Sequence, residues 1–196
     1  MLSVEMDELG INAGLQDRVV QCYEGLVYMD FAREVMARHN GAHGAYTELD
    51  ARACLPARGL FLCYLPDPSD SGKIHSDVKC RWLDGDAAVI EGMKVFGALT
   101  VQARHALEAG DWPALRKLMD LNFDQRRKLY GDACIGADNL RMVSIARAHG
   151  AAAKFSGSGG AIVGFCDDAR RLGGLRAALE AADFVFTELR VQGGGK

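Results

Sequence analysis

The spacing of apolar residues predicts helices through much of the second half of the chain. Between Asp86, which can cap a helix, and Gly110, which can end one, apolar residues recur every three or four positions. A second stretch of this kind begins at Asp111, carries Pro113 in its first turn, and reaches about Tyr130. The same spacing predicts two further helices, at residues 137–149 and 168–182.

Short, continuous apolar runs predict strands buried in a sheet. The most compact run is GLFLCYL, residues 59–65, which Pro66 ends. Two more runs, residues 151–156 and 161–166, flank a cluster of glycines. Further strands are expected at residues 26–31, 45–49 and 184–191.

The order of these elements predicts an α+β fold. Beyond residue 55 the chain reads strand, three helices, two strands joined by a glycine turn, helix and strand. This order favours an antiparallel sheet with helices packed mainly on one face. Glycine and small polar residues near residue 40 predict a division into residues 1–40 and 41–196. Residues 3–10, SVEMDELG, have the pattern of the end of a helix, so we expect the fold to begin upstream of Met1.

Composition and charge exclude several classes of function. A formal net charge of −3 and a pI of about 5.9 leave no electrostatic footprint for nucleic acid or an anionic membrane. The basic run at residues 126–128 is therefore expected on a solvated helix face. No apolar run is long enough to span a membrane, and the acidic start lacks the core of a signal peptide. Six cysteines without C-x-x-C spacing predict reduced thiols in a cytoplasmic protein and no metal site.

The first stretch with candidate chemistry surrounds Asp17. Gly10 and Gly14 bracket a turn, after which Gln16 and Asp17 open a short amphipathic segment. Its apolar side is expected to carry Leu15, Val19, Val20 and Tyr23. The helix dipole favours the ionised form of an aspartate in a first helical turn, and such a carboxylate can orient or deprotonate a hydroxyl. A simple helix cap is the alternative interpretation of Asp17.

The second stretch is the glycine loop, GSGG, at residues 157–160. Three glycines in four residues let the backbone approach a ligand closely and point several N–H groups in one direction, as in an anion nest. A dinucleotide-binding loop does not fit, because that fingerprint opens a helix whereas this loop opens a strand. A plain glycine hairpin is the alternative. On the preceding helix, Asn122 shares a face with apolar residues and therefore needs a hydrogen-bonding partner.

These two stretches together resemble the GHMP small-molecule kinases. In that family a helix with M-x-x-N precedes a segment that runs from A-x-x-x-G-A to K-x-[TS]-G-[AS]-G-G, and residues 118–165 resemble this pattern. The matched positions are Met119, Asn122, Ala146, Gly150, Ala151, Lys154, Ser156, Gly157, Ser158, Gly159 and Gly160. The stretch ending at Asp17 is similar to the segment that supplies the family's active-site aspartate. Five blocks, AGLQDRV, GLVYMDF, PSDSGKIHS, RWLDGD and AAAKFSGSGGA, resemble the plant glucuronokinases within the family.

The resemblance implies a fold and a reaction. The fold would be a ferredoxin-like C-terminal GHMP kinase domain at residues 41–196, preceded by the tail of the N-terminal domain. The reaction would be Mg²⁺-dependent transfer of the ATP γ-phosphoryl group to the anomeric hydroxyl of glucuronate, giving glucuronate 1-phosphate. Asp17 would orient or deprotonate the hydroxyl, and Lys154, Ser156 and the glycine loop would lie near phosphates and substrate.

A buried sugar carboxylate also needs a cation. Arg18, Lys73 and Arg81 are the candidates for that role, and Gly14, Gln16 and Asn122 complete the candidate substrate residues.

The sequence also departs from the family pattern. Neither the P-G-R-[VI] segment nor the G-L-[SG]-[SG]-S-[SA] phosphate loop occurs in the 196 residues. We therefore expect the first half of the kinase to be supplied in the same chain or by a partner, and the Mg²⁺ ligands are not located. Two alternatives stay open: a kinase for galactose, arabinose or fucose, and a non-catalytic sugar-binding or regulatory remnant.

Overall fold

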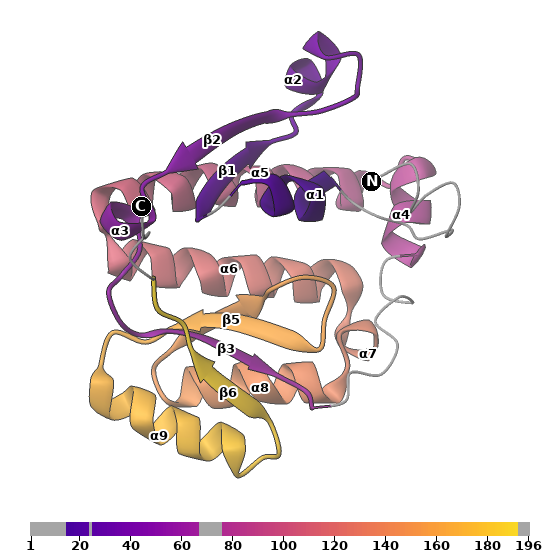
Figure 1. Ribbon diagram of the computed structural model, residues 1–196. Coiled ribbons are helices and arrows are strands. Elements are labelled where there is room, and N and C mark those ends of the chain that lie inside the picture. Colours follow the sequence, from indigo (N-terminus) through magenta and orange to yellow (C-terminus); the bar gives the residue numbers. More distant parts are fainter. Residues whose placement is uncertain (1–14, 24, 67–75, 192–196) are drawn as a thin grey trace. The chain divides into compact units, whose positions relative to one another are not determined.

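The computed structural model describes residues 15–23, 25–66 and 76–191, which form two compact units, Met1–Cys54 and Leu55–Lys196 (Figure 1). The division falls after Cys54 and not near residue 40, because the strand at Ala45–Leu49 pairs with the strand at Leu26–Asp30. Hydrogen bonds between these strands join the residues on both sides of the expected boundary. That the first unit is part of an N-terminal kinase domain stays a prediction.

The first unit is built on one antiparallel strand pair. β1 (Leu26–Asp30) and β2 (Ala45–Leu49) pair along their full lengths, with Leu26 opposite Leu49. The helices are α1 (Leu15–Cys22), α2 (Arg33–Arg38) and α3 (Ala51–Cys54). In α1 Val19 is buried but Val20 is exposed, so the expected apolar side was wrong at Val20.

The second unit contains a four-stranded antiparallel sheet in the order β4-β5-β3-β6. The strands are β3 (Leu60–Tyr64), β4 (Ala152–Phe155), β5 (Ala161–Phe165) and β6 (Val185–Glu188). The helices are α4 (Ser76–Leu83), α5 (Ala87–Ala109), α6 (Trp112–Tyr130), α7 (Asp132–Ile135), α8 (Ala137–Ala148) and α9 (Ala169–Glu180). This strand order confirms the predicted ferredoxin-like α+β fold.

Local signals fix the ends of the long helices. The side chain of Asp86 accepts hydrogen bonds from two N–H groups in the first turn of α5, and Gly110 ends that helix with a φ of 64°. Asp111 caps α6 in the same way, through the N–H of Ala114. Side-chain caps satisfy N–H groups that have no partner within the helix, so these predicted boundaries are confirmed. None of the described helices combines the length and hydrophobicity needed to cross a bilayer.

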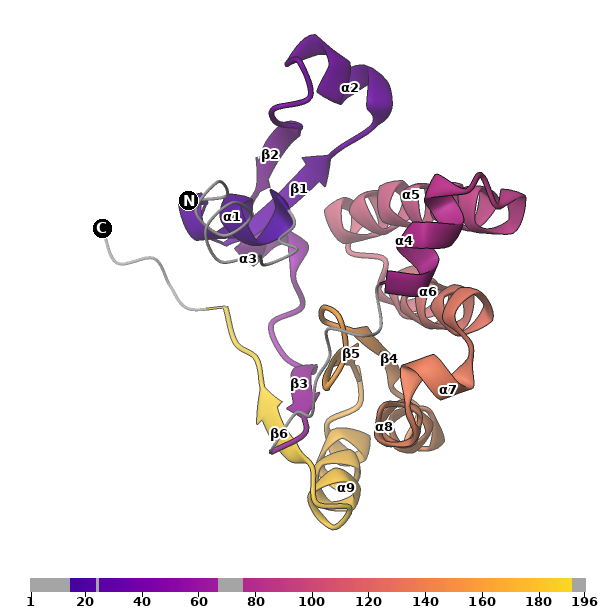
Figure 2. The same cartoon turned by 90° about the vertical axis from the view of Figure 1, so that its right-hand side faces the viewer.

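The main core lies between the sheet and the pair α8 and α9. Phe61 and Cys63 of β3, Ile162 of β5 and Phe186 of β6 pack there against helix residues such as Leu175. A second cluster joins α5 and α6 to β4 and β5. Figure 2 shows β4 next to α6 and α8, with β6 at the opposite edge of the sheet. The helix-covered edge of the sheet therefore carries the β4–β5 connection, which is the glycine loop.

Candidate functional site

The glycine loop closes the hairpin between β4 and β5. Below the loop Phe155 pairs with Ile162, and the N–H of Ser156 donates to the carbonyl of Ala161 over 3.2 Å. Gly159 and Gly160 have φ values of 151° and 74°, which side chains disfavour, so the turn needs glycine at these positions. The hairpin alternative is thus correct as a description of the backbone, and it does not conflict with ligand binding.

Asn139 holds one end of the loop. This buried side chain on α8 donates from Nδ2 to the carbonyl of Ile135 over 2.8 Å. Its Oδ1 accepts a hydrogen bond of 2.9 Å from the N–H of Gly160. Both polar ends of the amide are therefore satisfied. The sequence analysis missed Asn139. Its signal in the sequence was its position three and four residues before the apolar Met142 and Val143, which places a polar side chain on the apolar face of the helix.

Arg126 holds the other end of the loop from α6. Its two terminal nitrogens donate to the carbonyls of Gly157 and Ser158 over 2.9 and 3.1 Å. The guanidinium carbon lies 4.6 Å from the ring centre of Phe155 and 5.1 Å from that of Tyr130. The expectation that the whole basic run faces solvent was therefore wrong at Arg126. A half-buried arginine four residues before Tyr130 lies on the inner side of the helix.

Arg127 and Lys128, the next residues of the basic run, behave as expected. Both are exposed, and Arg127 forms an ion pair with Asp132 with an Nε–Oδ1 distance of 2.6 Å. A rotation of about 100° per residue separates neighbouring side chains on a helix. Arg126 and Arg127 therefore have the same charge but different surroundings.

Lys154 is the second cation beside the loop. Its Nζ donates to the carbonyl of Phe155 over 2.6 Å. Burial lowers the pKa of Lys154, and the charge of Arg126 lowers that pKa further. Burial likewise lowers the pKa of Arg126. Within residues 15–23, 25–66 and 76–191, neither cation forms an ion pair with a carboxylate.

The loop also presents backbone donors. The N–H groups of Gly157, Ser158 and Gly159 donate to no other residue in the described part of the chain. Successive N–H groups of this kind can bind an oxyanion, and two nearby cations favour its charge. The arrangement therefore fits a phosphate or carboxylate group.

Asp17 lies in the first unit, in the first turn of α1. Its side chain is 75% exposed, and Oδ2 lies 3.3 Å from Nη1 of Arg18. Gln16 is also exposed, whereas Arg18 is largely buried. Gly14 and Lys73 lie outside the described residues. The catalytic role of Asp17 stays a prediction.

Arg81 and Asn122 have different surroundings in the second unit. Arg81 lies 2.9 Å from Asp86 and 3.7 Å from Asp77, and it also donates to the carbonyl of Leu129 over 3.1 Å. These contacts tie α4 to α5 and α6, so the guanidinium already has a structural function. Asn122 is half-buried and makes no hydrogen bond to another described residue, which leaves its amide available to a ligand.

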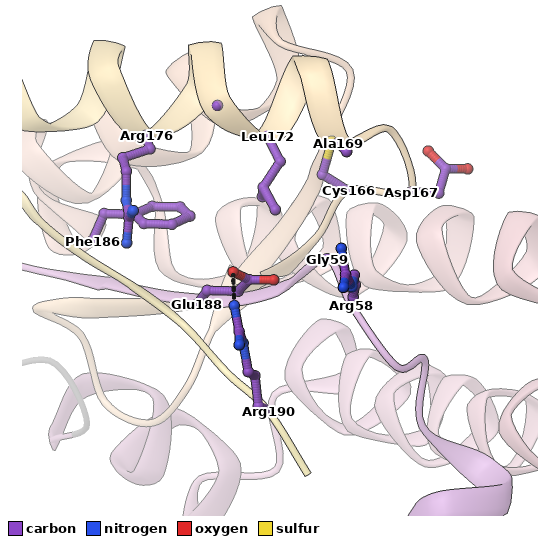
Figure 3. A pocket seen from close by; sticks show the side chains of 11 residues that line it. Arg58, Gly59, Cys166, Asp167, Ala169, Leu172, Arg176, Phe186, Glu188 and Arg190 are labelled. Atoms are coloured by element: carbon purple, nitrogen blue, oxygen red, sulfur yellow. Dashed lines mark hydrogen bonds and ion pairs between the residues drawn. The ribbon is translucent and has the colours of Figure 1, made fainter.

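A separate pocket of about 340 Å³ lies between α9 and the ends of β3, β5 and β6. Figure 3 shows Arg58, Arg176 and Arg190 around it, with Arg190 paired to Glu188 at 3.3 Å. None of the predicted site residues in the described part of the chain lines this pocket. The candidate site is therefore the glycine loop and its two cations. In that same part of the chain, no three His, Cys, Asp or Glu side chains cluster to hold a metal ion.

Comparison with known proteins agrees with this fold and this loop. Residues 103–184 match the family described as "GHMP kinases C terminal", a stretch that contains Arg126, Asn139 and the glycine loop. The chain belongs to the GHMP kinase family. It is 53% identical over 168 residues to "Glucuronokinase 1" of Arabidopsis thaliana, covering 86% of this chain and 45% of the relative. "Probable glucuronokinase 2" of the same plant is 51% identical over 162 residues, covering 82% and 43%.

Solved structures of GHMP kinases share the fold. Streptococcus pneumoniae phosphomevalonate kinase, in complex with phosphomevalonate and AMPPNP, matches 94% of this chain and 57% of its own, with a TM-score of 0.71 and 16% identity. Leishmania major mevalonate kinase, in complex with R-mevalonate, matches 84% and 47%, with a TM-score of 0.65 and 20% identity. The chain spans just under half the length of the two Arabidopsis relatives.

Proposed function

We propose that this GHMP kinase chain belongs to a glucuronokinase, which transfers the γ-phosphoryl group of ATP to the anomeric hydroxyl of D-glucuronate. The observation that carries the proposal is the arrangement at the glycine loop. Three N–H groups of the loop have no acceptor among the described residues, and they lie beside Arg126 and Lys154, which form no ion pair with a described carboxylate. Identity of 53% and 51% to relatives named as glucuronokinases supports the choice of sugar.

The residues of this chain would mainly position and neutralise charge. ATP supplies the phosphoryl group, and Mg²⁺ neutralises charge on it. Phosphoryl transfer asks little covalent chemistry of the protein, so oriented donors carry much of the rate. Lys154 and the loop N–H groups would hold a phosphate or substrate oxyanion, and Asp17 would orient or deprotonate the attacking hydroxyl. The described residues show no metal cluster, but Mg²⁺ often uses only one or two carboxylates together with phosphate oxygens.

The nucleotide phosphate loop would come from outside these residues. The sequence holds no G-L-[SG]-[SG]-S-[SA] motif. We propose that such a motif is supplied by a longer form of the chain or by a partner. A protein that joins this chain to a segment with the P-G-R and G-L-x-x-S-S motifs is therefore the form to assay.

The test is formation of ADP and sugar 1-phosphate with glucuronate, galactose, arabinose and fucose as acceptors. In the joined protein, Asp17→Asn should lower kcat with glucuronate about 100-fold or more, the range for loss of a general base. Asp138→Asn is the matched control, because Asp138 is also an exposed aspartate in a first helical turn. Equal turnover by the Asp17 variant would remove that residue from the chemistry. Faster turnover of a neutral sugar would overturn glucuronate as the substrate.

A second candidate function is sugar binding without catalysis. Calorimetry on the 196-residue chain distinguishes the two. Saturable glucuronate binding, with no ATP binding and no turnover by the joined protein, would support the binding function. Turnover by the joined protein would exclude it.

A further inference from the structure

We propose that Arg126 is a positioning residue of the glycine loop, holding the carbonyls of Gly157 and Ser158 so that the N–H groups of residues 157–159 remain available to an oxyanion. This inference rests on the proposed function of the loop as an oxyanion site. It assigns a role to a residue that was expected, as part of the basic run at residues 126–128, on a solvated helix face.

The geometry of the guanidinium suits this role. Its two terminal nitrogens reach the carbonyls of two successive residues, Gly157 and Ser158, over 2.9 and 3.1 Å. Arginine presents its donors in a rigid planar fork, whereas a lysine ammonium is a point charge on a flexible stem. Arginine can therefore fix the orientation of two neighbouring peptide groups, which lysine cannot do equally well.

The surroundings hold Arg126 in place. The guanidinium lies over the rings of Phe155 and Tyr130, from the strand before the loop and from its own helix. Its Nε is buried and has no hydrogen-bond partner among the residues that the structure describes, which is a cost that the stacking contacts help to offset. Such a costly placement is consistent with a functional constraint on the loop.

The loop is fixed by separate helices at its two ends. Arg126 of α6 donates hydrogen bonds to carbonyls at the start of the loop, while Asn139 of α8 accepts a hydrogen bond from the N–H of Gly160 at its end. A carbonyl oxygen that faced the ligand would repel an anion. The hydrogen bonds from Arg126 keep the carbonyls of Gly157 and Ser158 turned away from the ligand that the N–H groups would bind. The three intervening N–H groups of residues 157–159 have no acceptor in the described part of the chain.

The charges of Arg126 and Lys154 also favour an oxyanion at the loop. Arg126 and Lys154 are both half-buried, and neither is paired with a carboxylate in the described ranges. Burial without a counter-charge is unfavourable for a cation, so a bound oxyanion would relieve it. Mutual repulsion adds to the effect, since the charge of Arg126 lowers the pKa of Lys154.

The experiment is a titration of the 196-residue chain with inorganic phosphate, at constant ionic strength, followed through the amide resonances of Gly157, Ser158 and Gly159. In the wild type these resonances should shift saturably. Arg126→Gln should weaken the phosphate affinity roughly tenfold or more, because a half-buried cation and two hydrogen bonds are lost. Arg126→Lys keeps the charge without the fork, so its affinity should fall roughly threefold.

Arg127→Gln is the matched control, since it removes the same charge one residue away, where Arg127 pairs with Asp132. Its phosphate affinity should stay within about twofold of the wild type, as expected for an exposed charge. If Arg126→Lys binds phosphate as tightly as the wild type, charge alone is sufficient and positioning is wrong. If the loop resonances of the wild type do not respond to phosphate, the oxyanion site itself is wrong.

The test of Arg126 depends neither on the folding of the glutamine variant nor on kinase activity. Should Arg126→Gln fail to fold, the comparison of Arg126→Lys with the wild type still decides the proposal. Phosphate binding is measured without turnover, so loss of the kinase proposal and loss of the Arg126 proposal are distinguishable. A joined protein that fails to phosphorylate glucuronate would overturn the first, while an Arg126-dependent phosphate shift would still support the second.

Discussion

The side chain of Asn139 accepts a hydrogen bond of 2.9 Å from the backbone N–H of Gly160, 21 residues away in the sequence. Through its other end the same amide donates to the carbonyl of Ile135 over 2.8 Å. The glycine loop is thus anchored to the first turn of α8. A loop of three glycines would otherwise be the most mobile kind of backbone, so this anchor gives it a defined shape.

Asn139→Ala should destabilise the chain. It leaves a backbone N–H and a carbonyl without their buried partner, which costs about 1–3 kcal/mol in the free energy of unfolding. Urea unfolding followed by circular dichroism measures this change. Asn122→Ala is the control, because Asn122 is half-buried and makes no hydrogen bond to another described residue. Equal losses in both variants would show that the contact to Gly160 contributes little.

Gly164→Ala should also destabilise the chain, through packing. A Cβ at Gly164 would overlap the ring of Phe61 and the backbone carbonyl of Ala152, so the neighbouring strands would have to shift. Overpacking of this kind costs about 1–3 kcal/mol in the free energy of unfolding. Gly97→Ala provides a control of opposite sign, since Gly97 is in α5 with open space around it. Alanine there should stabilise the helix by about 0.5–1 kcal/mol, and thermal unfolding would reveal both signs.

Lys154→Met should change how stability depends on pH. Burial and Arg126 lower the pKa of Lys154 in the folded chain below its usual value of 10.5. Between the folded and the unfolded pKa the unfolded state binds more protons, so the wild type gains stability as the pH rises through this window. The methionine variant lacks that gain. Its stability relative to the wild type should therefore be highest near neutral pH and should decline as the pH approaches 10.5.

Urea midpoints of both proteins between pH 7 and pH 10, a window chosen to approach the usual lysine pKa, provide the measurement. A constant difference across this range would mean that the pKa of Lys154 is not lowered. Comparing the two proteins at each pH cancels the other groups that titrate in the same range.

Helix and strand boundaries were predictable where their signals are local. Asp86 and Asp111 cap α5 and α6 as expected, and Gly110 separates them, because capping depends on atoms within a few residues. The strand at Leu60–Tyr64 was equally clear from its continuous apolar run. The short helices α2, α3 and α7 were not predicted, since four to six residues carry too little periodicity to be recognised.

The candidate site was only partly predictable for the same reason. The glycines and Lys154 are evident in the sequence because their spacing is distinctive. The environment of Arg126 is not, because its partners Gly157 and Ser158 lie about thirty residues later and on another element. The three basic residues at 126–128 are chemically similar in the sequence, and only packing of α6 against β4 distinguishes the first from the other two.

The sequence alone thus determined the α+β order of elements, the GHMP kinase family and the position of the glycine loop, because those depend on local patterns. The tertiary structure decided which cation holds that loop and which amide anchors it. It also showed that Arg81 is bound to Asp86. Burial and hydrogen-bond partners depend on residues brought together from distant parts of the chain, and no local pattern contains that information.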